Sequence, residues 1–391
     1  MNFIRAWAIG GLLAATPVWA VYAPIPEQEQ GKDLTVSVRG GASYDSNLFG
    51  AATGAVDSMI WELAPKIAYN ASVTDQTFFS ASYGLTLSQF DDRPGDKLLD
   101  SHDLALRVAH AFSQTSNLDI NEVYMLSRNP ESLLAGIPLS PDQSFARNQL
   151  DARYVRPLTA KIGLTIKART VNYDYRTASL GRSLDRTENL YGVSGDYAIM
   201  QELKAVGEYR RQDVYYRKIG EAKNKASDFL MGGLDYSVAK KWMLNGRLGA
   251  ESRRRAAERD VTVPYAELSF KYDYTETSFL TGGYAYTLDE TSDTIRFTDS
   301  KINRFFLNAQ HSLSALVVAS ASLGWEPSQL QGRRGFANLD ETTTRAGVAL
   351  SYLPRKNWSI SVSCDYDRVN SDDAARNLRR NRAGLSSTYS F

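Results

Sequence analysis

The sequence is poor in the residues from which most enzyme and metal sites are built. Its 391 residues include one cysteine, Cys364, and three histidines. A single cysteine excludes an internal disulfide, and no Cys/His metal spacing, glycine-rich phosphate loop or serine elbow is present. His102 and Asp103 are neighbours in a predicted strand, so their side chains point to opposite faces and form no direct dyad. We therefore predict that the protein is not an enzyme and has no catalytic, metal or cofactor-binding residues.

Charge of one sign and long apolar runs are lacking as well. The formal net charge of +1 gives no electrostatic reason to expect a nucleic acid partner. With 43% hydrophobic residues and a mean hydropathy of -0.35, the chain is too polar for a helical membrane protein. The apolar run from Ala6 to Ala15 is too short to span a bilayer as a helix.

That short run has the context of a secretory signal. Arg5 supplies the positive end, and Val18-Trp19-Ala20 places small residues where a signal peptidase cleaves. We predict a signal peptide at 1–20, cleaved after Ala20, a periplasmic lead-in at 21–33, and one barrel domain at 34–391. A closed barrel needs no apolar helix, because its backbone groups are paired between strands.

Aromatic residues and period-two patterns dominate the rest of the chain. In the segment 34–44, apolar residues occupy one parity and polar residues the other, which predicts a strand with two different environments on its faces. The segment 58–71 repeats this pattern, and Pro65 within it predicts a bulge because proline cannot donate to the ladder. In most such segments the apolar parity is nearly free of charge.

A repeat of about 40 residues organises these strands. In each unit a tyrosine or histidine ends a strand just before a short polar turn. The connections on the other side are longer, as at 91–100, 129–144, 176–186, 329–340 and 370–380. This alternation predicts a single closed antiparallel transmembrane β-barrel of about eighteen strands, with sixteen or another even number as the alternative. The recurring aromatic residues would form a girdle at the periplasmic membrane interface; they are Tyr69, His110, Tyr154, Tyr197, Tyr236, Tyr272, His311 and Tyr352.

Two other architectures were weighed. A solenoid or propeller also has repeats of this length, but its connections would not alternate between short and long. A soluble periplasmic β-protein stays open as a binding module. The last strand favours the membrane barrel, because it ends in Tyr389 and Phe391 on its apolar parity and resembles the closing strand of bacterial outer-membrane barrels. That resemblance implies an assembly signal at these two residues and a barrel insertion machinery as a partner, beside outer-membrane lipid.

The polar parity carries acidic and basic side chains in near balance. In a barrel this parity faces the interior, so the sequence predicts a polar, mixed-charge lumen and favours a pore. A lumen filled by ion pairs is the alternative, and the segment 129–144 is a candidate to fold inward. The predicted lumen-facing basic residues are Arg39, Lys66, Arg107, Arg153, Lys167, Arg169, Arg210, Arg247, Lys271, Arg304 and Arg345.

One short motif points to a family. The stretch Tyr44-Asp45-Ser46-Asn47-Leu48-Phe49 resembles a sequence found early in a family of outer-membrane β-barrel porins (type 2), whose members often accompany exopolysaccharide biosynthesis genes. The resemblance implies a pore in exopolysaccharide export across the bacterial outer membrane, with a polysaccharide and a synthesis or export complex as partners. A general diffusion porin, a structural or adhesive barrel and a barrel hydrolase are the alternatives. From the residues alone, Asp45 and Asn47 suit a turn where the strand leaves the membrane.

Overall fold

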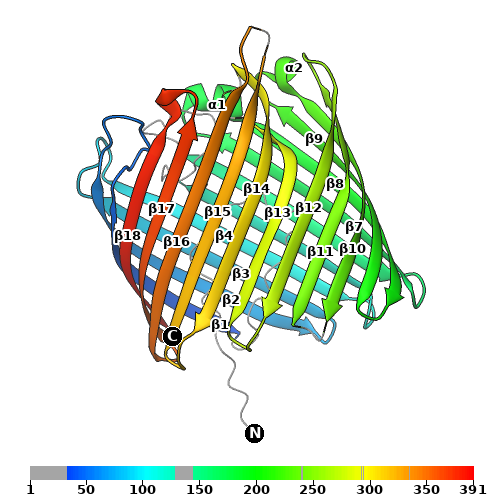
Figure 1. Cartoon of the computed structure of the whole chain (residues 1–391). Coiled ribbons are helices and arrows are strands. Elements are labelled where there is room, and N and C mark those ends of the chain that lie inside the picture. Colours follow the sequence, from blue (N-terminus) through cyan, green and yellow to red (C-terminus); the bar gives the residue numbers. More distant parts are fainter. Residues whose placement is uncertain (1–32, 128–143, 239–240, 292, 294, 334) are drawn as a thin grey trace.

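Every strand of the protein is antiparallel to its neighbours, and the first strand pairs with the last. The computed structural model describes residues 33–127, 144–238, 241–291, 293, 295–333 and 335–391. In these residues, β1 (Leu34–Asp45) pairs with β2 (Ser58–Thr74) on one side and with β18 (Leu378–Ser390) on the other. The register of the closing seam runs from Ser37 opposite Ser390 to Asp45 opposite Arg382. The result is a closed barrel of 18 strands, as predicted (Figure 1).

The remaining strands follow in chain order around the wall. They are β3 (Thr77–Phe90), β4 (Leu98–Ala111), β5 (Asn117–Ser127), β6 (Phe145–Pro157), β7 (Ile162–Tyr175), β8 (Arg186–Met200), β9 (Leu203–Tyr216), β10 (Lys225–Val238), β11 (Trp242–Arg255), β12 (Val261–Asp273), β13 (Phe279–Glu290), β14 (Phe297–Ser312), β15 (Val317–Gly332), β16 (Leu339–Arg355) and β17 (Trp358–Ser371).

The two ends of the barrel differ. One end carries the short turns and the end of β18; we call it the short-turn end. The other, the long-loop end, carries the longer connections, which include α1 (Ala178–Leu184), α2 (Gly220–Lys223) and the 3₁₀ helix η1 (Ala374–Arg376) (Figure 1). No helix among the described residues has the length and apolar character needed to cross a membrane.

Side chains alternate between the outer and inner surfaces of the wall. Contacts between strands that are not neighbours identify the inner surface, because such side chains can meet only across the concave side. Arg210 of β9 donates to the Tyr265 hydroxyl of β12 at 3.2 Å, and Lys225 of β10 lies 2.7 Å from Asp299 of β14. The opposite parity carries exposed apolar side chains such as Leu230 and Leu248, at 71% and 70% exposure. A band of this kind is what lipid requires.

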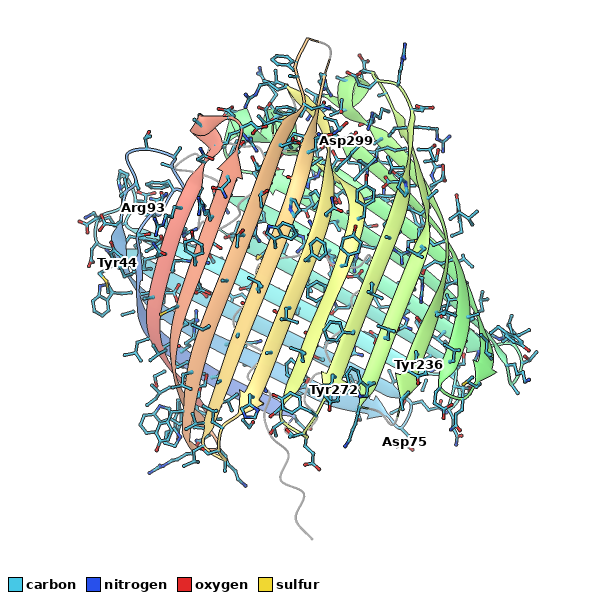
Figure 2. All side chains as sticks on the ribbon, in the orientation of Figure 1. Tyr44, Asp75, Arg93, Tyr236, Tyr272 and Asp299 are labelled. Atoms are coloured by element: carbon cyan, nitrogen blue, oxygen red, sulfur yellow. The ribbon has the colours of Figure 1, made fainter. Side chains whose placement is uncertain are left out.

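Aromatic rings border this apolar band near the short-turn end. The eight predicted girdle positions all lie on the outer parity set by the registers, and Figure 2 shows Tyr236 and Tyr272 at this end. Tyr272 is stacked on Trp242 with ring centroids 3.9 Å apart. In the last strand and just after it, Tyr389 and Phe391 also point outward. Their rings make an edge-to-face contact with centroids 5.0 Å apart.

Near the long-loop end the outer surface is charged. The sequence analysis did not predict this, because it found the outward, apolar parity of most strands nearly free of charged residues. Arg211 of β9 lies 3.3 Å from Asp228 of β10, and Arg254 of β11 lies 2.9 Å from the same carboxylate. The Tyr209 hydroxyl donates to Asp228 at 2.7 Å. Because an arginine at mid-bilayer costs about 2–4 kcal/mol, this cluster defines the upper limit of the apolar band.

Two local predictions were wrong. Pro65 produces no bulge: the register is unchanged from Leu63 opposite Leu87 to Lys66 opposite Gly84, and only the pairing with β3 between them is interrupted. Several long connections are also shorter than predicted. Half of the segment expected as a loop at 329–340 is strand, because β15 continues to Gly332 and β16 begins at Leu339. Three other predicted loops shorten to 91–97, 176–185 and 372–377. The strands continue because their polar side chains pair across the ladder, as Gln329 does with Asp340 at 2.9 Å.

Candidate functional site

The inner surface of the wall is the candidate site, and the predicted basic residues lie there. All eleven of them are on the inner parity of their strands. Eight of them have a carboxylate partner on the same strand, on a neighbouring strand or, for Lys167 of β7 and Glu208 of β9, two strands away. The pairs are Arg39–Glu62 (3.1 Å), Arg107–Asp119 (2.5 Å), Lys167–Glu208 (3.1 Å), Arg169–Asp151, Arg210–Glu208 (2.7 Å), Arg247–Asp235 (2.7 Å), Lys271–Asp273 (2.9 Å) and Arg304–Asp289 (2.9 Å).

Three predicted basic residues differ from the rest. Within the described part of the chain, Lys66 of β2, Arg153 of β6 and Arg345 of β16 make no ion pair. Lys66 and Arg153 are exposed, and the buried Nε of Arg345 has no hydrogen-bond acceptor among the described residues. An unpaired cation keeps its donors and its charge available to a solute, whereas a paired one has already committed them. Lys66 is attracted by the Asp103 carboxylate of β4. Among the eleven predicted residues, Arg153 and Arg345 are therefore best suited to contact a passing solute.

A buried ionic cluster reinforces the inner wall at the long-loop end, where Figure 2 shows Asp299. The Asp299 side chain is fully buried, and it lies 2.7 Å from Lys225 and 2.8 Å from Arg253. Lys225 also lies 2.9 Å from Glu290, which accepts a hydrogen bond from the Tyr216 hydroxyl at 2.6 Å. These contacts connect β9, β10, β11, β13 and β14. Such a cluster stabilises only as a complete set, because removing one member leaves a buried charge without its partner.

The first long connection, 46–57, folds toward the interior. Leu48 is fully buried and Phe49 is 8% exposed, and both pack against inner-wall residues of β2, β3 and β4. The guanidinium of Arg93, from the connection 91–97 between β3 and β4, lies 5.9 Å from the ring centroid of Phe49. The other members of this apolar cluster are Val56, Ile60, Phe90 and Leu99.

A second apolar cluster forms where α1 packs on the neighbouring part of the wall. Leu184 is buried and Leu180 is half-buried, and both contact inner-wall aromatic residues of β6 and β7. Phe145 and Tyr175 have ring centroids 5.7 Å apart. Arg186 lies 4.1 Å from the ring centroid of Tyr173, which joins this cluster to the charged wall.

Sequence reasoning missed both clusters. It assigned the inner parity a polar character throughout, yet Phe90, Leu99 and Phe145 occupy that parity near the long-loop end. The sequence signal that could have identified the clusters is a break in the apolar/polar alternation of a strand next to a connection with apolar residues. The connection 46–57, which contains Leu48 and Phe49, is an example. The predicted inward segment 129–144 lies outside the described residues except for Ser144.

α2 carries one buried lysine at the mouth, in the connection between β9 and β10 and outside the spanning strands. The Lys223 ammonium lies 4.9 Å from the ring centroid of Tyr216, and the residue is 6% exposed. Burial is the main cause that lowers the pKa of Lys223 to about 7; Glu290 opposes this shift and the positive charge of Lys225 adds to it. This lysine therefore changes its charge near neutral pH.

The histidines give little support to hydrolysis. As predicted, His102 is not bonded to Asp103; its ring instead lies between Asp100, at 2.9 Å, and the Tyr83 hydroxyl, at 2.8 Å, on the outer surface. Sequence reasoning missed these two partners. Asp100 lies two residues before His102 on the same outward face of β4, and Tyr83 faces outward from the neighbouring strand β3. Among the described residues, no group of three or more His, Cys, Asp or Glu side chains is placed to hold a metal ion.

Comparisons with known proteins agree on the architecture. No protein-family model and no curated protein matches the sequence. The fold is similar to that of OccK2 (OpdF) from Pseudomonas aeruginosa, solved in complex with glucuronate, at 11% identity over 92% of this chain and 97% of that chain, with a TM-score of 0.50. The outer membrane protein OpdK from the same organism (10% identity, 92% and 99% coverage, TM-score 0.47) and the FrpB iron transporter from Neisseria meningitidis (8%, 92% and 82%, 0.48) are also similar. At 11% identity, the likeness to OccK2 shows a shared fold alone.

Proposed function

We propose that the protein is a passive, water-filled pore of the bacterial outer membrane. The observation that carries the proposal is the contrast between the two surfaces of one closed wall. The outer surface is apolar between an aromatic girdle and a charged rim, and the inner surface carries ionic side chains. An 18-stranded barrel is wide enough to leave an aqueous channel when nothing fills it.

The orientation follows from the same features. Short turns of outer-membrane barrels lie in the periplasm and long loops outside the cell, so the girdle around Tyr236 and Tyr272 would lie at the periplasmic interface. Export through a cleaved signal peptide at 1–20, with a lead-in at 21–33, completes this proposal. The proposed partners are outer-membrane lipid and the machinery that inserts barrels.

The pore should discriminate only weakly between solutes, with a slight preference for anions over cations. Most inner-wall charges neutralise one another in pairs, which lowers the field that a passing ion experiences. Among the eleven predicted basic residues, Lys66, Arg153 and Arg345 make no ion pair in the described part of the chain. The inner-wall carboxylate Asp103 makes none either but attracts Lys66, which leaves Arg153 and Arg345 as the uncompensated charges. A pore of this kind suits hydrated solutes of low charge density, and it fits a general diffusion porin.

Exopolysaccharide export is the favoured finer function, and the resemblance of Tyr44–Phe49 supports it. In that function Arg153 and Arg345 would contact sugar hydroxyls or carboxylates, for which the planar donor fork of arginine is suited. Arg107, Arg169, Arg247 and Arg304 also face inward, but each already pairs with a carboxylate, so we assign them a structural role in the barrel wall.

Two measurements together test these proposals. Conductance in planar bilayers reports whether purified barrel forms a pore, and polysaccharide secretion in a deletion strain reports the polymer function. Conductance with lost secretion supports export, and conductance with normal secretion supports a general porin. A silent bilayer with unchanged secretion would contradict both and leave a structural or adhesive barrel.

A further inference from the structure

The motif Tyr44–Phe49 lies at the long-loop end of the seam where the barrel closes. Asp45 of β1 and Arg380 of β18 are both on the inner surface, at 0% and 2% exposure. The Arg380 Nε donates to the two carboxylate oxygens of Asp45 at 3.0 and 2.9 Å, and the Arg380 Nη2 donates to Asp45 as well. This bidentate ion pair joins β1 to β18 at the long-loop end of the seam.

The next two motif residues extend the connection to β18 beyond the end of β1. Ser46 accepts a hydrogen bond from the Asn381 backbone N–H at 2.8 Å, and its own N–H donates to the Asn381 carbonyl at 3.0 Å. The Asn47 side-chain amide donates to the Arg379 carbonyl at 3.1 Å and to the Ala51 carbonyl at 2.8 Å. Its backbone N–H donates to the Asp45 carboxylate at 3.0 Å, so the motif is one connected unit.

The same unit directs the first connection into the barrel. The Ala51 N–H donates to the Asn47 side-chain oxygen at 2.9 Å, which closes a turn in which Gly50 has a φ of 63°. Leu48 and Phe49 follow Asn47 directly and are therefore turned toward the inner wall, where they join the apolar cluster with Phe90. In Figure 2, Tyr44 and Arg93 lie at the side of the barrel that carries this connection.

We propose that the Asp45–Arg380 pair and Asn47 form a latch, and that the latched segment 46–57 sets the aperture of the pore at its long-loop end. The proposal rests on the proposed pore function. The latch exists only when β18 has closed on β1, so the inward position of the segment depends on a complete seam. Releasing the latch should free Leu48 and Phe49 from the wall and widen the mouth.

The position of Leu48 can be tested by thiol labelling without any transport assay. In a Cys364→Ser background, Leu48→Cys should resist a water-soluble maleimide in the folded barrel, because Leu48 is fully buried. Asp45→Asn and, separately, Asn47→Ala should convert this cysteine to a labelled one. Arg211→Gln, at the outer surface of the same end, is the control and should leave it protected. Heat-modifiable gel mobility would verify that each variant is folded. If Asp45→Asn does not fold, labelling in the Asn47→Ala variant alone decides the result.

Single-channel conductance then tests the aperture. Asp45→Asn and Asn47→Ala barrels should show a larger and noisier unit conductance than the wild type, and Arg211→Gln should not. Protection of Leu48→Cys in both folded latch variants would overturn the latch, and labelling without a change in conductance would overturn its role in the aperture. A wild-type barrel that conducts nothing would instead refute the proposed pore, while the labelling result would still report on the latch.

Discussion

The Lys225 ammonium of β10 lies 2.7 Å from the Asp299 carboxylate of β14, although these two strands are not neighbours in the wall. Asp299 is fully buried and also faces Arg253 at 2.8 Å. The curvature of the closed barrel is what brings the two strands within reach across the inner surface. Loss of the carboxylate would leave these cations buried without their shared counter-charge.

Asp299→Asn should therefore destabilise the barrel by about 3–5 kcal/mol, the usual cost of breaking one side of a buried pair. Thermal loss of heat-modifiable gel mobility in detergent would measure it. Asp75→Asn, in an exposed turn at the short-turn end, is the matched control and should change stability by less than about 0.5 kcal/mol. Equal effects of the two substitutions would show that the buried cluster does not stabilise the wall.

Ion selectivity should depend on the unpaired inner-wall cations. The double substitution Arg153→Gln with Arg345→Gln should shift the reversal potential in a salt gradient toward cation preference, because it removes two uncompensated charges from the lining. Arg254→Gln, which removes a charge from the outer surface, should leave the reversal potential unchanged. Identical shifts in both variants would contradict the assignment of inner and outer surfaces.

Stability should rise with pH between about 7 and 10.5 through Lys223. Burial holds the pKa of Lys223 at about 7, whereas the unfolded chain has the ordinary value of 10.5. In this range the unfolded chain binds a proton that the folded barrel does not, so raising the pH favours the folded state. Lys223→Met should flatten the dependence of the thermal midpoint on pH across this window. An unchanged slope in the variant would assign the dependence to other groups.

Assembly should depend on the aromatic end of β18. Tyr389 and Phe391 point outward beside Trp358, and the Phe391 N–H donates to the Val36 carbonyl at 2.8 Å. Deleting Phe391 should lower the amount of barrel recovered in the outer membrane, whereas Ser390→Ala should not. Quantitative blotting of membrane fractions measures both, and normal insertion without Phe391 would remove the assembly role.

The overall architecture was predictable because two independent signals agreed. Alternation identifies each strand, and the recurrence of Tyr69, His110 and their equivalents counts the turns. Parity then assigns each side chain to one surface, which is why the eleven basic residues were placed together without knowledge of their partners. The count of eighteen strands and the closure of β1 on β18 are confirmed by the registers.

The details at the mouth were not predictable, since they depend on contacts between segments far apart in the chain. Nothing local links Asp45 to Arg380, and from the residues alone the motif at Tyr44–Phe49 predicted only a turn. Likewise, parity predicts that Arg107 and Arg153 face inward, and the register places Asp119 opposite Arg153. Only the side-chain contacts show that Asp119 pairs with Arg107 instead, at 2.5 Å. At Pro65 a local sequence feature led to a wrong prediction of a bulge. The missing backbone donor of this proline interrupts the pairing with β3 without changing the register.

Planar-bilayer recording of the purified, folded wild-type barrel tests the central claim most directly. A passive, water-filled pore should give discrete conductance steps that increase in proportion to the bulk salt concentration and show only weak anion preference. A barrel that retains heat-modifiable mobility yet inserts without producing any conductance step would contradict the proposed pore.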